Sequence, residues 1–212
     1  MGTYNLAAIT KRIYGSGFSF FNLKTLKDIL EIKKEAALFL VVKKLIKTGI
    51  LIKIEKNKYL LEGAKTSDFA LANFLYQSSY VSFESALNFY GILSQFPYEI
   101  SSATARKTVK KEFQDKVFTY TRIKKDLFWG YEKKQGFIIA LPEKALADQL
   151  YLSSKGYKRM NLDEYNLEII SAPKLKKYLD QYPKTRQFKS VLRGLGEYIR
   201  SRRDKSLLHP SL

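Results

Sequence analysis

The chain has 212 residues, 45% of them hydrophobic and 14% aromatic, and a net charge of +18; these values exclude wholesale disorder and favour a folded protein with a polyanionic partner. It contains no cysteine and a single histidine, His209, so a disulfide, thiol catalysis, a zinc site and a histidine-based triad are excluded within one chain. The longest apolar run is far shorter than the ~18 residues of a membrane span and the N-terminus lacks a signal-peptide core, so we expect a cytoplasmic protein without a membrane partner.

The first 30 residues predict two helices separated by a short aromatic segment. Apolar residues recur at helical spacing from a start near residues 3–5 until Gly15-Ser16-Gly17 ends the pattern. Residues 18–21 form either a short strand or an aromatic plug. A second helix is predicted over 23–30, with Asn22 as its N-cap.

A third helix followed by a hairpin is the pattern around which the N-terminal part is organised. The helix is predicted over 35–48 and stops at Gly49, where a C-cap is expected. Residues 50–55 then alternate as a strand, and Asn57 suits the left-handed position of a polar turn that leads into a second strand over 59–61. The order of helices and hairpin predicts a winged helix-turn-helix.

The predicted winged helix-turn-helix domain spans residues 1–62 and carries many lysines. In this arrangement the third helix lies in the major groove of double-stranded DNA and the hairpin reaches an adjacent phosphate or the minor groove. Lysine supplies charge to phosphates, where geometry is undemanding. The predicted DNA-binding residues are Lys33, Lys34, Lys43, Lys44, Lys47, Lys53, Lys56 and Lys58, together with Arg200, Arg202 and Arg203 near the end of the chain.

The outer face of the third helix lacks the side chains that usually read bases. If Leu38, Leu45 and their apolar neighbours face the core, the outer positions near the helix start are Ala36, Phe39 and Leu40, and no Arg, Asn or Gln stands there for bidentate contacts. This face could meet thymine methyl groups, or it could be a dimer or domain interface. A homodimer on the DNA is therefore compatible with the sequence.

Charge is concentrated at the two ends of the chain. Residues 1–65 hold 13 basic and five acidic side chains, residues 66–154 hold 11 and nine, and residues 155–212 hold 14 and six. A polyanionic partner explains this distribution. The alternative is a general over-use of lysine, which does not explain the balanced middle segment.

The remainder of the chain predicts a mixed α/β domain over residues 66–205, so the fold class is α+β. We expect a small, mostly antiparallel sheet followed by C-terminal helices. The predicted helices cover 69–77, 83–92 with Ser82 as N-cap, 143–152 opened by Pro142, 162–170, 173–182 and 186–203; the predicted strands cover 80–81, 98–110, 116–123, 128–132 and 136–140.

Five blocks of this second part resemble the AbiEi-type antitoxin family. They are Tyr80-Val81-Ser82-Phe83-Glu84-Ser85-Ala86-Leu87, Tyr90-Gly91-Ile92, Phe118-Thr119-Tyr120, Phe128-Trp129-Gly130-Tyr131 and the phrase Ala140-Leu141-Pro142-Glu143-Lys144-Ala145-Leu146-Ala147-Asp148. No block is a catalytic signature, but their order and spacing together are fairly specific. The resemblance covers roughly residues 20 to 200. Members of the family often carry arginine on the reading helix and glycine in the wing turn, where this chain has lysines and Asn57.

The resemblance implies an antitoxin of a type IV, AbiE-like system of phage defence. It implies that the protein represses its own operon by binding promoter DNA. It also implies that the protein opposes a co-encoded nucleotidyltransferase-like toxin without a stable complex. The residues that match the family motifs are Tyr80, Ser82, Ser85, Gly91, Gly130, Pro142, Glu143, Lys144 and Asp148.

These motif residues also have plain structural explanations. Glu143 suits the first turn of a helix, and Lys144 and Asp148 have the spacing of an i,i+4 pair worth ~0.3 kcal/mol. The functional alternative places them on an interaction surface. Trp129 is either a core residue or an exposed residue that stacks on a base.

We expect no cofactor, no metal and no enzymatic activity. The alternatives are a protein-interaction module, which would dock through Ala36, Phe39 and Leu40, and a metal-dependent nuclease. The nuclease would use Asp115 or Asp126 with Glu132-Lys133-Lys134 on neighbouring strands, because clustered carboxylates hold Mg²⁺.

Overall fold

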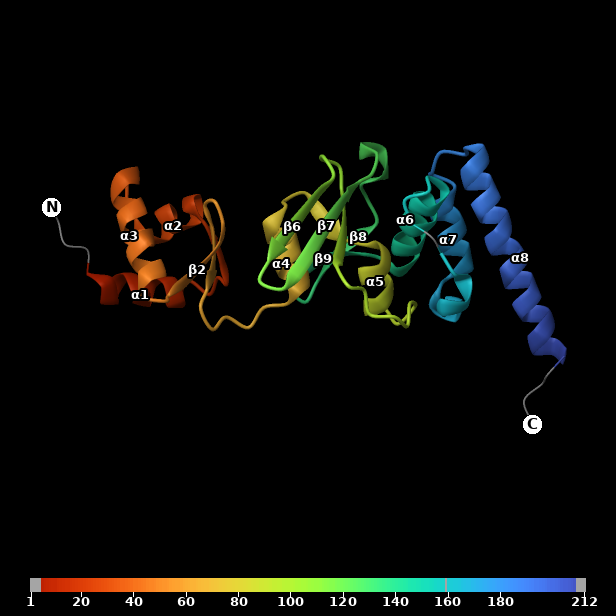
Figure 1. The fold of residues 1–212 in the computed structure, drawn as a ribbon, viewed down its shortest axis with the longest axis horizontal. Helices are drawn as coiled ribbons and strands as arrows, with labels where there is room; N and C mark the ends of the chain where they lie inside the picture. The colour runs from red at the N-terminus through yellow and green to blue at the C-terminus, as the bar shows by residue number, and fades with distance from the viewer. Residues whose placement is uncertain (1–4, 159, 209–212) are drawn as a thin grey trace. The chain divides into compact units, whose positions relative to one another are not determined.

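The computed structural model describes residues 5–158 and 160–208, with side chains described as far as Arg202. The chain folds as a mixed α+β protein with two sheets (Figure 1). It divides into two compact units, Met1–Leu75 and Tyr76–Leu212. Helix α4, which lies beyond the boundary expected near residues 62–66, is grouped with the first unit.

The first unit combines helices with a three-stranded antiparallel sheet in the order β1-β3-β2. The third helix and the hairpin follow each other closely along the chain, as their sequence predicted. The helices are α1 (Leu6–Gly15), α2 (Leu23–Leu30), α3 (Glu35–Lys47) and α4 (Asp68–Leu75), and the strands are β1 (Phe20–Asn22), β2 (Leu51–Glu55) and β3 (Lys58–Leu61).

Local side-chain chemistry explains where these elements begin and turn. The Asn5 carboxamide oxygen accepts hydrogen bonds from the first free backbone N–H groups of α1, and the Asn22 oxygen does the same at α2, 2.8 Å from the Thr25 nitrogen. Asn57 adopts the left-handed conformation with φ of 61° between β2 and β3. The predicted N-cap Asn22 and turn residue Asn57 are thus confirmed.

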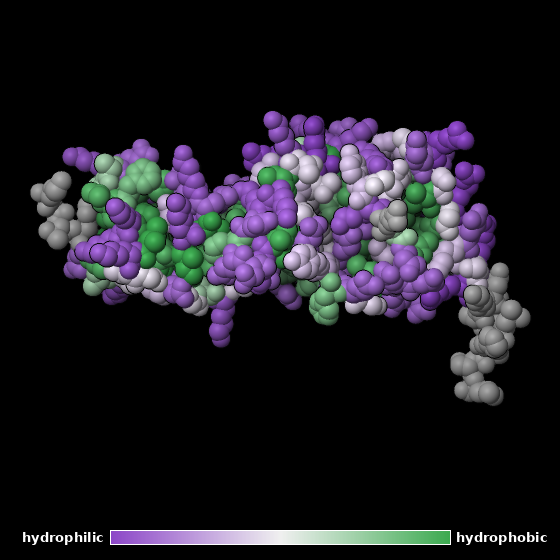
Figure 2. All heavy atoms as spheres, in the orientation of Figure 1, coloured by the Kyte–Doolittle hydropathy of each residue, from purple (hydrophilic) through white to green (hydrophobic). Residues whose placement is uncertain are grey.

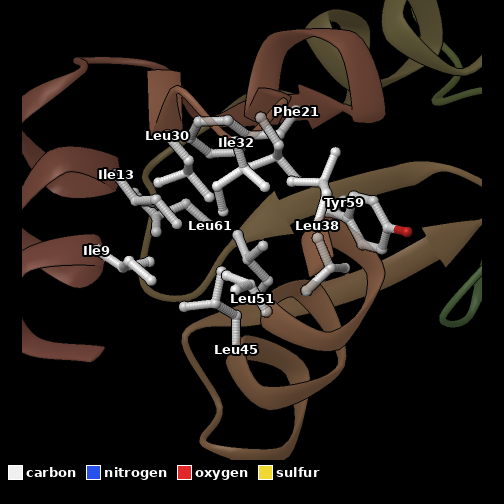
Figure 3. Packing of buried hydrophobic residues seen from close by; sticks show 13 residues of the cluster. Ile9, Ile13, Phe21, Leu30, Ile32, Leu38, Leu45, Leu51, Tyr59 and Leu61 are labelled. Carbon is white, nitrogen blue, oxygen red and sulfur yellow. The ribbon is translucent and has the colours of Figure 1, made fainter. Parts of the chain in front are cut away.

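One apolar core holds the first unit together. Side chains from α1, α2, α3 and the sheet meet there, and Ile13, Phe21, Leu26 and Leu45 are fully enclosed (Figure 3). The buried residues of α3 recur at helical spacing, so one face of this helix belongs to the core and the other is exposed. They are Leu38, Val41, Val42 and Leu45.

The second unit is built on a six-stranded sheet in the order β6-β7-β5-β4-β9-β8. The pairs β5/β7 and β4/β9 are parallel and the other three neighbouring pairs are antiparallel. The sheet is therefore larger and more mixed than predicted. Its strands are β4 (Ser79–Val81), β5 (Ile100–Thr104), β6 (Val109–Phe113), β7 (Lys116–Arg122), β8 (Tyr131–Lys134) and β9 (Phe137–Ala140).

Helix α6 is the central helix of the second unit and packs against α5, α7 and α8. Ten consecutive residues of it, from Glu143 to Leu152, are buried, and Figure 1 shows α6, α7 and α8 together on one side of the sheet. The α-helices are α5 (Phe83–Phe89), α6 (Pro142–Ser154), α7 (Ala172–Leu179) and α8 (Arg186–Leu208); the 3-10 turns are η1 (Lys125–Leu127), η2 (Leu162–Glu164) and η3 (Leu167–Ile169).

The prediction of a helix over 162–170 is wrong, because that segment forms the two 3-10 turns η2 and η3. Asn161 and Asn166 explain the difference: each side chain accepts a hydrogen bond from the backbone N–H two residues further on. Such local side-chain bonds compete with the hydrogen bonds of a continuous helix.

None of the helices in the described residues has the length and apolar character that a membrane span requires.

Candidate functional site

Helix α3 presents a row of free lysines to solvent. Lys33 and Lys34 are exposed just before the helix, with Lys34 at the N-cap position, and Lys43, Lys44 and Lys47 are exposed along its C-terminal half. Lys43 and Lys47 stand opposite the buried face of α3, because helical periodicity separates them from the buried residues. All five predicted phosphate-binding lysines of this segment are therefore accessible.

The three lysines of the hairpin β2–β3 differ in exposure. Lys53 and Lys56 are exposed. Lys58, by contrast, has a side chain only 21% exposed, and its Nζ lies 2.6 Å from the Glu55 carboxylate. The ammonium also donates to the Leu75 carbonyl and lies 5.7 Å from the centroid of the Phe74 ring. Lys58 is thus held inside its own unit rather than offered to a phosphate, unlike its predicted role.

A register shift in the hairpin explains the position of Lys58. The pairing of β2 with β3 shifts between Lys53 and Glu55, which sets Glu55 opposite Lys58. A bulge of this kind redirects a side chain away from the regular alternation of a strand. Alternation of residues in the sequence does not reveal such a shift.

The outward face of α3 near its start is apolar, as predicted. Phe39 is 44% exposed and Leu40 is 64% exposed, and Ala36 is exposed beside them. Figure 2 shows hydrophobic side chains gathered on the visible face of this unit, over the region that α3 occupies in Figure 1. Phe39 also lines a groove together with Lys43 of α3 and with Lys53 and Lys56 of the hairpin.

The C-terminal arginines lie on or near α8 and differ in accessibility. Arg200 is exposed. Arg202 lies over the Tyr198 ring, 5.3 Å from its centroid, and 3.8 Å from the Asp163 carboxylate, and it lines a pocket of about 570 Å³ in its own unit. The side chain of Arg203 and the whole of His209 lie outside the described residues. Arg202 is therefore partly engaged within the second unit.

The second unit encloses a charged pair at its centre. Lys144 and Asp148 stand one turn apart on α6, and both side chains are 0% exposed, with Lys144 Nζ 2.5 Å from Asp148 Oδ1. The predicted i,i+4 pair is present, but it is buried. Neither residue can belong to an interaction surface in this fold.

Asp148 gathers donors from widely separated parts of the chain. Its Oδ2 accepts from the Tyr80 hydroxyl at 3.0 Å and from the Ser82 hydroxyl at 2.9 Å. Its Oδ1 accepts from Lys144 and from the Tyr182 hydroxyl, the latter at 2.7 Å. A buried carboxylate is tolerated when its charge is paired and its lone pairs are hydrogen-bonded, and both conditions hold here.

Three aromatic rings surround the ammonium of Lys144. Its Nζ lies 5.5 Å from the centroid of Tyr80, 4.9 Å from that of Trp129 and 5.3 Å from that of Tyr182, and it donates to the Tyr182 hydroxyl at 2.8 Å. Cation–π attraction compensates part of the lost hydration. We call Tyr80, Ser82, Trp129, Lys144, Asp148 and Tyr182 the buried polar centre.

The backbone at Gly130 packs closely against the side chain of Lys144 in the buried polar centre. Its φ is +73°, and a Cβ added there would lie 3.0 Å from Lys144 Cγ and 3.1 Å from Cδ. Only glycine combines this backbone conformation with the absence of a side chain. Gly130 thus serves the packing of Lys144.

Burial governs the acid–base behaviour of this centre. Burial first, and then the charge of Asp148, raise the pKa of Tyr80 and Tyr182 well above the usual value of 10.0. Burial also lowers the pKa of Lys144, while Asp148 opposes this shift. Because both charges are enclosed and hydrogen-bonded, the arrangement supports the fold.

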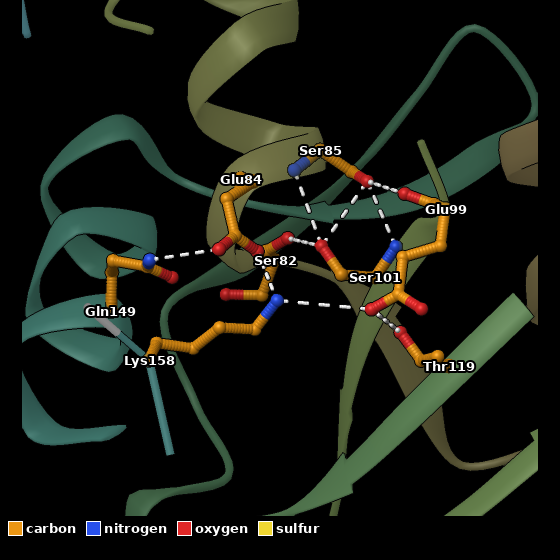
Figure 4. Close-up of polar contacts among 8 residues, drawn as sticks. All are labelled: Ser82, Glu84, Ser85, Glu99, Ser101, Thr119, Gln149 and Lys158. Carbon is orange, nitrogen blue, oxygen red and sulfur yellow. Dashed lines mark hydrogen bonds and ion pairs between the residues drawn. The ribbon is translucent and has the colours of Figure 1, made fainter. Parts of the chain in front are cut away.

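Ser82 and Ser85 belong to the same interior. Ser82 stands at the predicted N-cap position of α5, but its hydroxyl makes no capping bond and donates to Asp148 instead. Ser85 and Ser101 exchange hydrogen bonds, since each hydroxyl accepts from the backbone N–H of the other (Figure 4). Both serines join α5 to β5.

Glu84 and Glu99 are joined by Lys158 at the edge of this interior. Lys158 Nζ lies 3.0 Å from Glu84 and 3.7 Å from Glu99. Gln149 of α6 donates to Glu84, and Thr119 of β7 donates to Glu99, so each carboxylate is already occupied (Figure 4). This group of polar residues links the helices to the sheet.

The remaining motif residues also have structural places. Glu143 pairs with Lys174 at 2.9 Å and accepts from the Ser171 backbone N–H, which ties α6 to the start of α7. Pro142 stands at the start of α6, as predicted. Gly91 has φ of +70° just after α5, a conformation that glycine adopts without strain.

Asp115 and Glu132, two of the carboxylates proposed for a nuclease, do not lie on neighbouring strands, and the alternative Asp126 lies in the turn η1 rather than on a strand. Asp115 lies in the turn between β6 and β7, whereas Glu132 lies on β8, and the strands β5, β4 and β9 separate β7 from β8. Among the described residues, no three His, Cys, Asp or Glu side chains are grouped so that they could hold a metal ion. The expectation of neighbouring strands fails because β5, β4 and β9 lie between β7 and β8.

Two members of the buried polar centre were not among the site residues inferred from the sequence. Trp129 was expected only as a core or stacking residue, and Tyr182 stands 34 residues beyond Asp148, in a segment without any motif.

Comparison with known proteins adds no assignment, because no family model and no curated protein matches this chain.

Proposed function

We propose that this protein is a DNA-binding regulator whose first unit is a winged helix. The order of elements supports this: a helix, a short strand, two further helices and a hairpin, with the strands joined as β1-β3-β2. In a winged helix α3 would lie in the major groove and the hairpin β2–β3 would reach the neighbouring backbone.

The observation that carries the proposal is the exposure of the lysines. Lys43, Lys44 and Lys47 on α3 are free, and Lys53 and Lys56 extend the basic surface along the hairpin. Charges placed in this way neutralise phosphates and release counterions, which supplies affinity for any duplex. Acidic residues are few in this region, with five in residues 1–65 against 13 basic ones.

We further propose that the chain acts as an AbiEi-like antitoxin that represses its own operon. The support is the resemblance of residues 20–200 to that family, above all the phrase from Ala140 to Asp148. The burial of Lys144 and Asp148 assigns this phrase to the support of the second unit. Opposition to a nucleotidyltransferase-like toxin then belongs to the surface of that unit or to the repression of the operon.

Fluorescence anisotropy on DNA from upstream of the gene tests the regulatory half. Labelled upstream DNA and scrambled DNA of the same length are compared at two salt concentrations. We expect a preference of ~10³-fold or more for the upstream DNA, with an affinity that falls as salt rises. Equal, weak binding to both would overturn operator recognition.

A matched pair of charge-reversal variants localises the interface. Lys43→Glu, Lys44→Glu and Lys47→Glu combined should abolish binding. Lys124→Glu, Lys125→Glu and Lys133→Glu combined change the charge equally, at exposed positions of the second unit. This control should retain preference for the upstream DNA; equal losses in both variants would mean that only the total charge matters.

Co-expression tests the antitoxin half. The toxin encoded beside this gene is induced with and without the full chain, and we expect growth to recover only when the chain is present. Purification of a tagged chain from the same cells should yield no stoichiometric toxin. Failure of growth to recover would remove the antitoxin assignment and leave DNA binding intact.

The second candidate is a protein-interaction module, which the exposure of Phe39 and Leu40 favours. Such a module would lose its partner on Leu40→Asp and keep it on the lysine reversals of α3. The anisotropy experiment separates the two, because an interaction module has no preference for the upstream DNA.

A further inference from the structure

The exposed face of α3 is divided into an apolar half and a basic half. Ala36, Leu40, Lys43 and Lys47 recur at helical spacing and so share one line along the helix, with Phe39 beside it. The first turns of this line are apolar and the last turns are basic. All five side chains are exposed to solvent.

The division matches the two kinds of contact that a helix makes in the major groove. The N-terminal residues of a recognition helix contact base edges, and flanking cations contact phosphates. Glu35, exposed in the first turn, places a negative charge at the helix start. Lys33 and Lys34, exposed directly before it, offset this charge, so cations for phosphates stand on both sides of the apolar first turns.

The apolar groups on the edge of a base pair in the major groove are the C5-methyl groups of thymine. Phe39 lines the groove between α3 and the hairpin, where Lys43, Lys53 and Lys56 supply positive charge. A partner of this surface must therefore carry negative charge along its sides and apolar groups between them. Duplex DNA that presents thymine has both features.

We propose that Phe39 and Leu40 read thymine through its methyl group, with Ala36 permitting close approach of the helix to the base pairs. The proposal rests on DNA binding by the first unit and adds the source of its base preference. The protein distinguishes A·T from G·C pairs here by apolar contact rather than by bidentate hydrogen bonds.

Uracil substitution tests the proposal, because deoxyuridine lacks only the methyl group. The upstream DNA is synthesised with either thymine or uracil, and the full chain is titrated against both by anisotropy. Burial of one methyl group contributes about 0.8 kcal/mol, so we expect affinity to fall about fourfold for each contacted thymine. Unchanged affinity for the uracil DNA would overturn the proposal while preference over scrambled DNA still upheld regulatory binding.

Two matched variants show whether α3 is responsible. Leu40→Ala should weaken binding to thymine DNA and leave binding to uracil DNA nearly unchanged, since the missing methyl removes the contact that the variant would lose. Lys47→Gln should weaken binding to both DNAs by the same factor. If Leu40→Ala weakens binding to both equally, Leu40 acts through folding or self-association, and thymine reading by this residue is wrong.

Discussion

The two units of this protein use lysine in opposite ways. In the first unit Lys43, Lys44 and Lys47 lie on the surface of a helix whose other face fills an apolar core. In the second unit Lys144 is fully enclosed and paired with Asp148. The same residue type thus lies on the surface in one unit and supports the interior of the fold in the other.

The difference teaches that a motif and a charged residue do not identify an interface by themselves. A lysine on the surface keeps its hydration and can exchange water for a phosphate. An enclosed lysine has lost its water and depends on a carboxylate and aromatic rings. The buried polar centre of the second unit is therefore expected to be sensitive to single substitutions, and the surface of α3 is not.

The largest effect is expected for Asp148→Ala. It leaves the Lys144 ammonium and three hydroxyl groups without their acceptor, and breaking a buried pair in this way costs about 3–5 kcal/mol. Urea unfolding followed by the fluorescence of Trp129, the single tryptophan of the chain, measures the loss in this unit.

Asp163→Ala is the control for this substitution, because Asp163 is exposed and lies 3.8 Å from Arg202. Its effect should remain within about 0.5 kcal/mol. Adding Lys144→Met to Asp148→Ala should recover part of the stability, because the uncompensated charge is removed. A stability of Asp148→Ala equal to that of the original chain would refute the importance of the centre.

The next effect is expected for Gly130→Ala. The new Cβ would meet Lys144 at 3.0 Å in a backbone conformation with φ of +73°, so steric overlap adds to backbone strain. We expect a loss of about 3 kcal/mol, from ~1–2 for the left-handed conformation and the rest from overpacking.

Gly136→Ala separates these two contributions. Gly136 has φ of +87°, but nothing lies within 4 Å of the added Cβ. Its loss should therefore be only the ~1–2 kcal/mol of the backbone. Similar losses of stability at both positions would show that the Lys144 side chain moves away from the added methyl group, so that overpacking contributes nothing.

Lys43→Gln and Lys58→Gln sharpen the comparison within the first unit. Lys43 is free, so its loss should make the dependence of log affinity on log salt shallower by ~0.9, the value for one phosphate. Lys58 is held by Glu55 and Leu75, so its loss should leave the slope unchanged and lower stability by about 1 kcal/mol.

Anisotropy gives the salt slopes and circular dichroism during urea unfolding gives the stabilities, because the tryptophan lies in the other unit. An altered salt slope for Lys58→Gln would mean that Lys58 leaves its partners to bind DNA.

The smallest effect concerns the pH dependence of the pair between Glu143 and Lys174. Burial acts to raise the pKa of Glu143, but hydrogen bonds from Lys174 and backbone N–H groups outweigh it and lower the pKa below its ordinary value of 4.5. The ionised carboxylate therefore stabilises the fold above pH 4.5, and this contribution is lost as pH falls through the lower, folded-state pKa.

Glu143→Gln should be less stable than the original chain at pH 7 by less than about 1 kcal/mol, since Lys174 is 40% exposed and its charge is screened. Urea midpoints of the two proteins, measured from pH 7 down to below the lowered pKa of Glu143, should converge toward the acid end. A difference that is constant with pH would assign the effect to packing.

Much of the first unit could be predicted from the sequence. The caps Asn5 and Asn22, the turn residue Asn57 and the buried face of α3 each follow from rules that act over a few residues. In the second unit the same rules failed at 162–170, where Asn161 and Asn166 favour short turns over a continuous helix.

The residues of the candidate site divide along the same line. Their positions on α3 and the hairpin were predicted, because periodicity places charges opposite a core. The ion pair between Lys58 and Glu55 was not predicted, since it depends on a register shift in the hairpin. The placement of β5, β4 and β9 between β7 and β8, which separates Asp115 from Glu132, likewise depends on pairing between segments that are not adjacent in the sequence.

By itself the sequence determined the basic ends, the bounds of α2 and α3 and the apolar outer face of α3, because composition and local periodicity act over neighbouring residues. Only the tertiary structure decided what Lys144 and Asp148 do. Their partners Tyr80, Ser82 and Tyr182 stand far away along the chain and reach Asp148 only when β4, α6 and the segment after α7 pack together. Burial of a charge is a property of that packing, and no pattern of neighbouring residues encodes it.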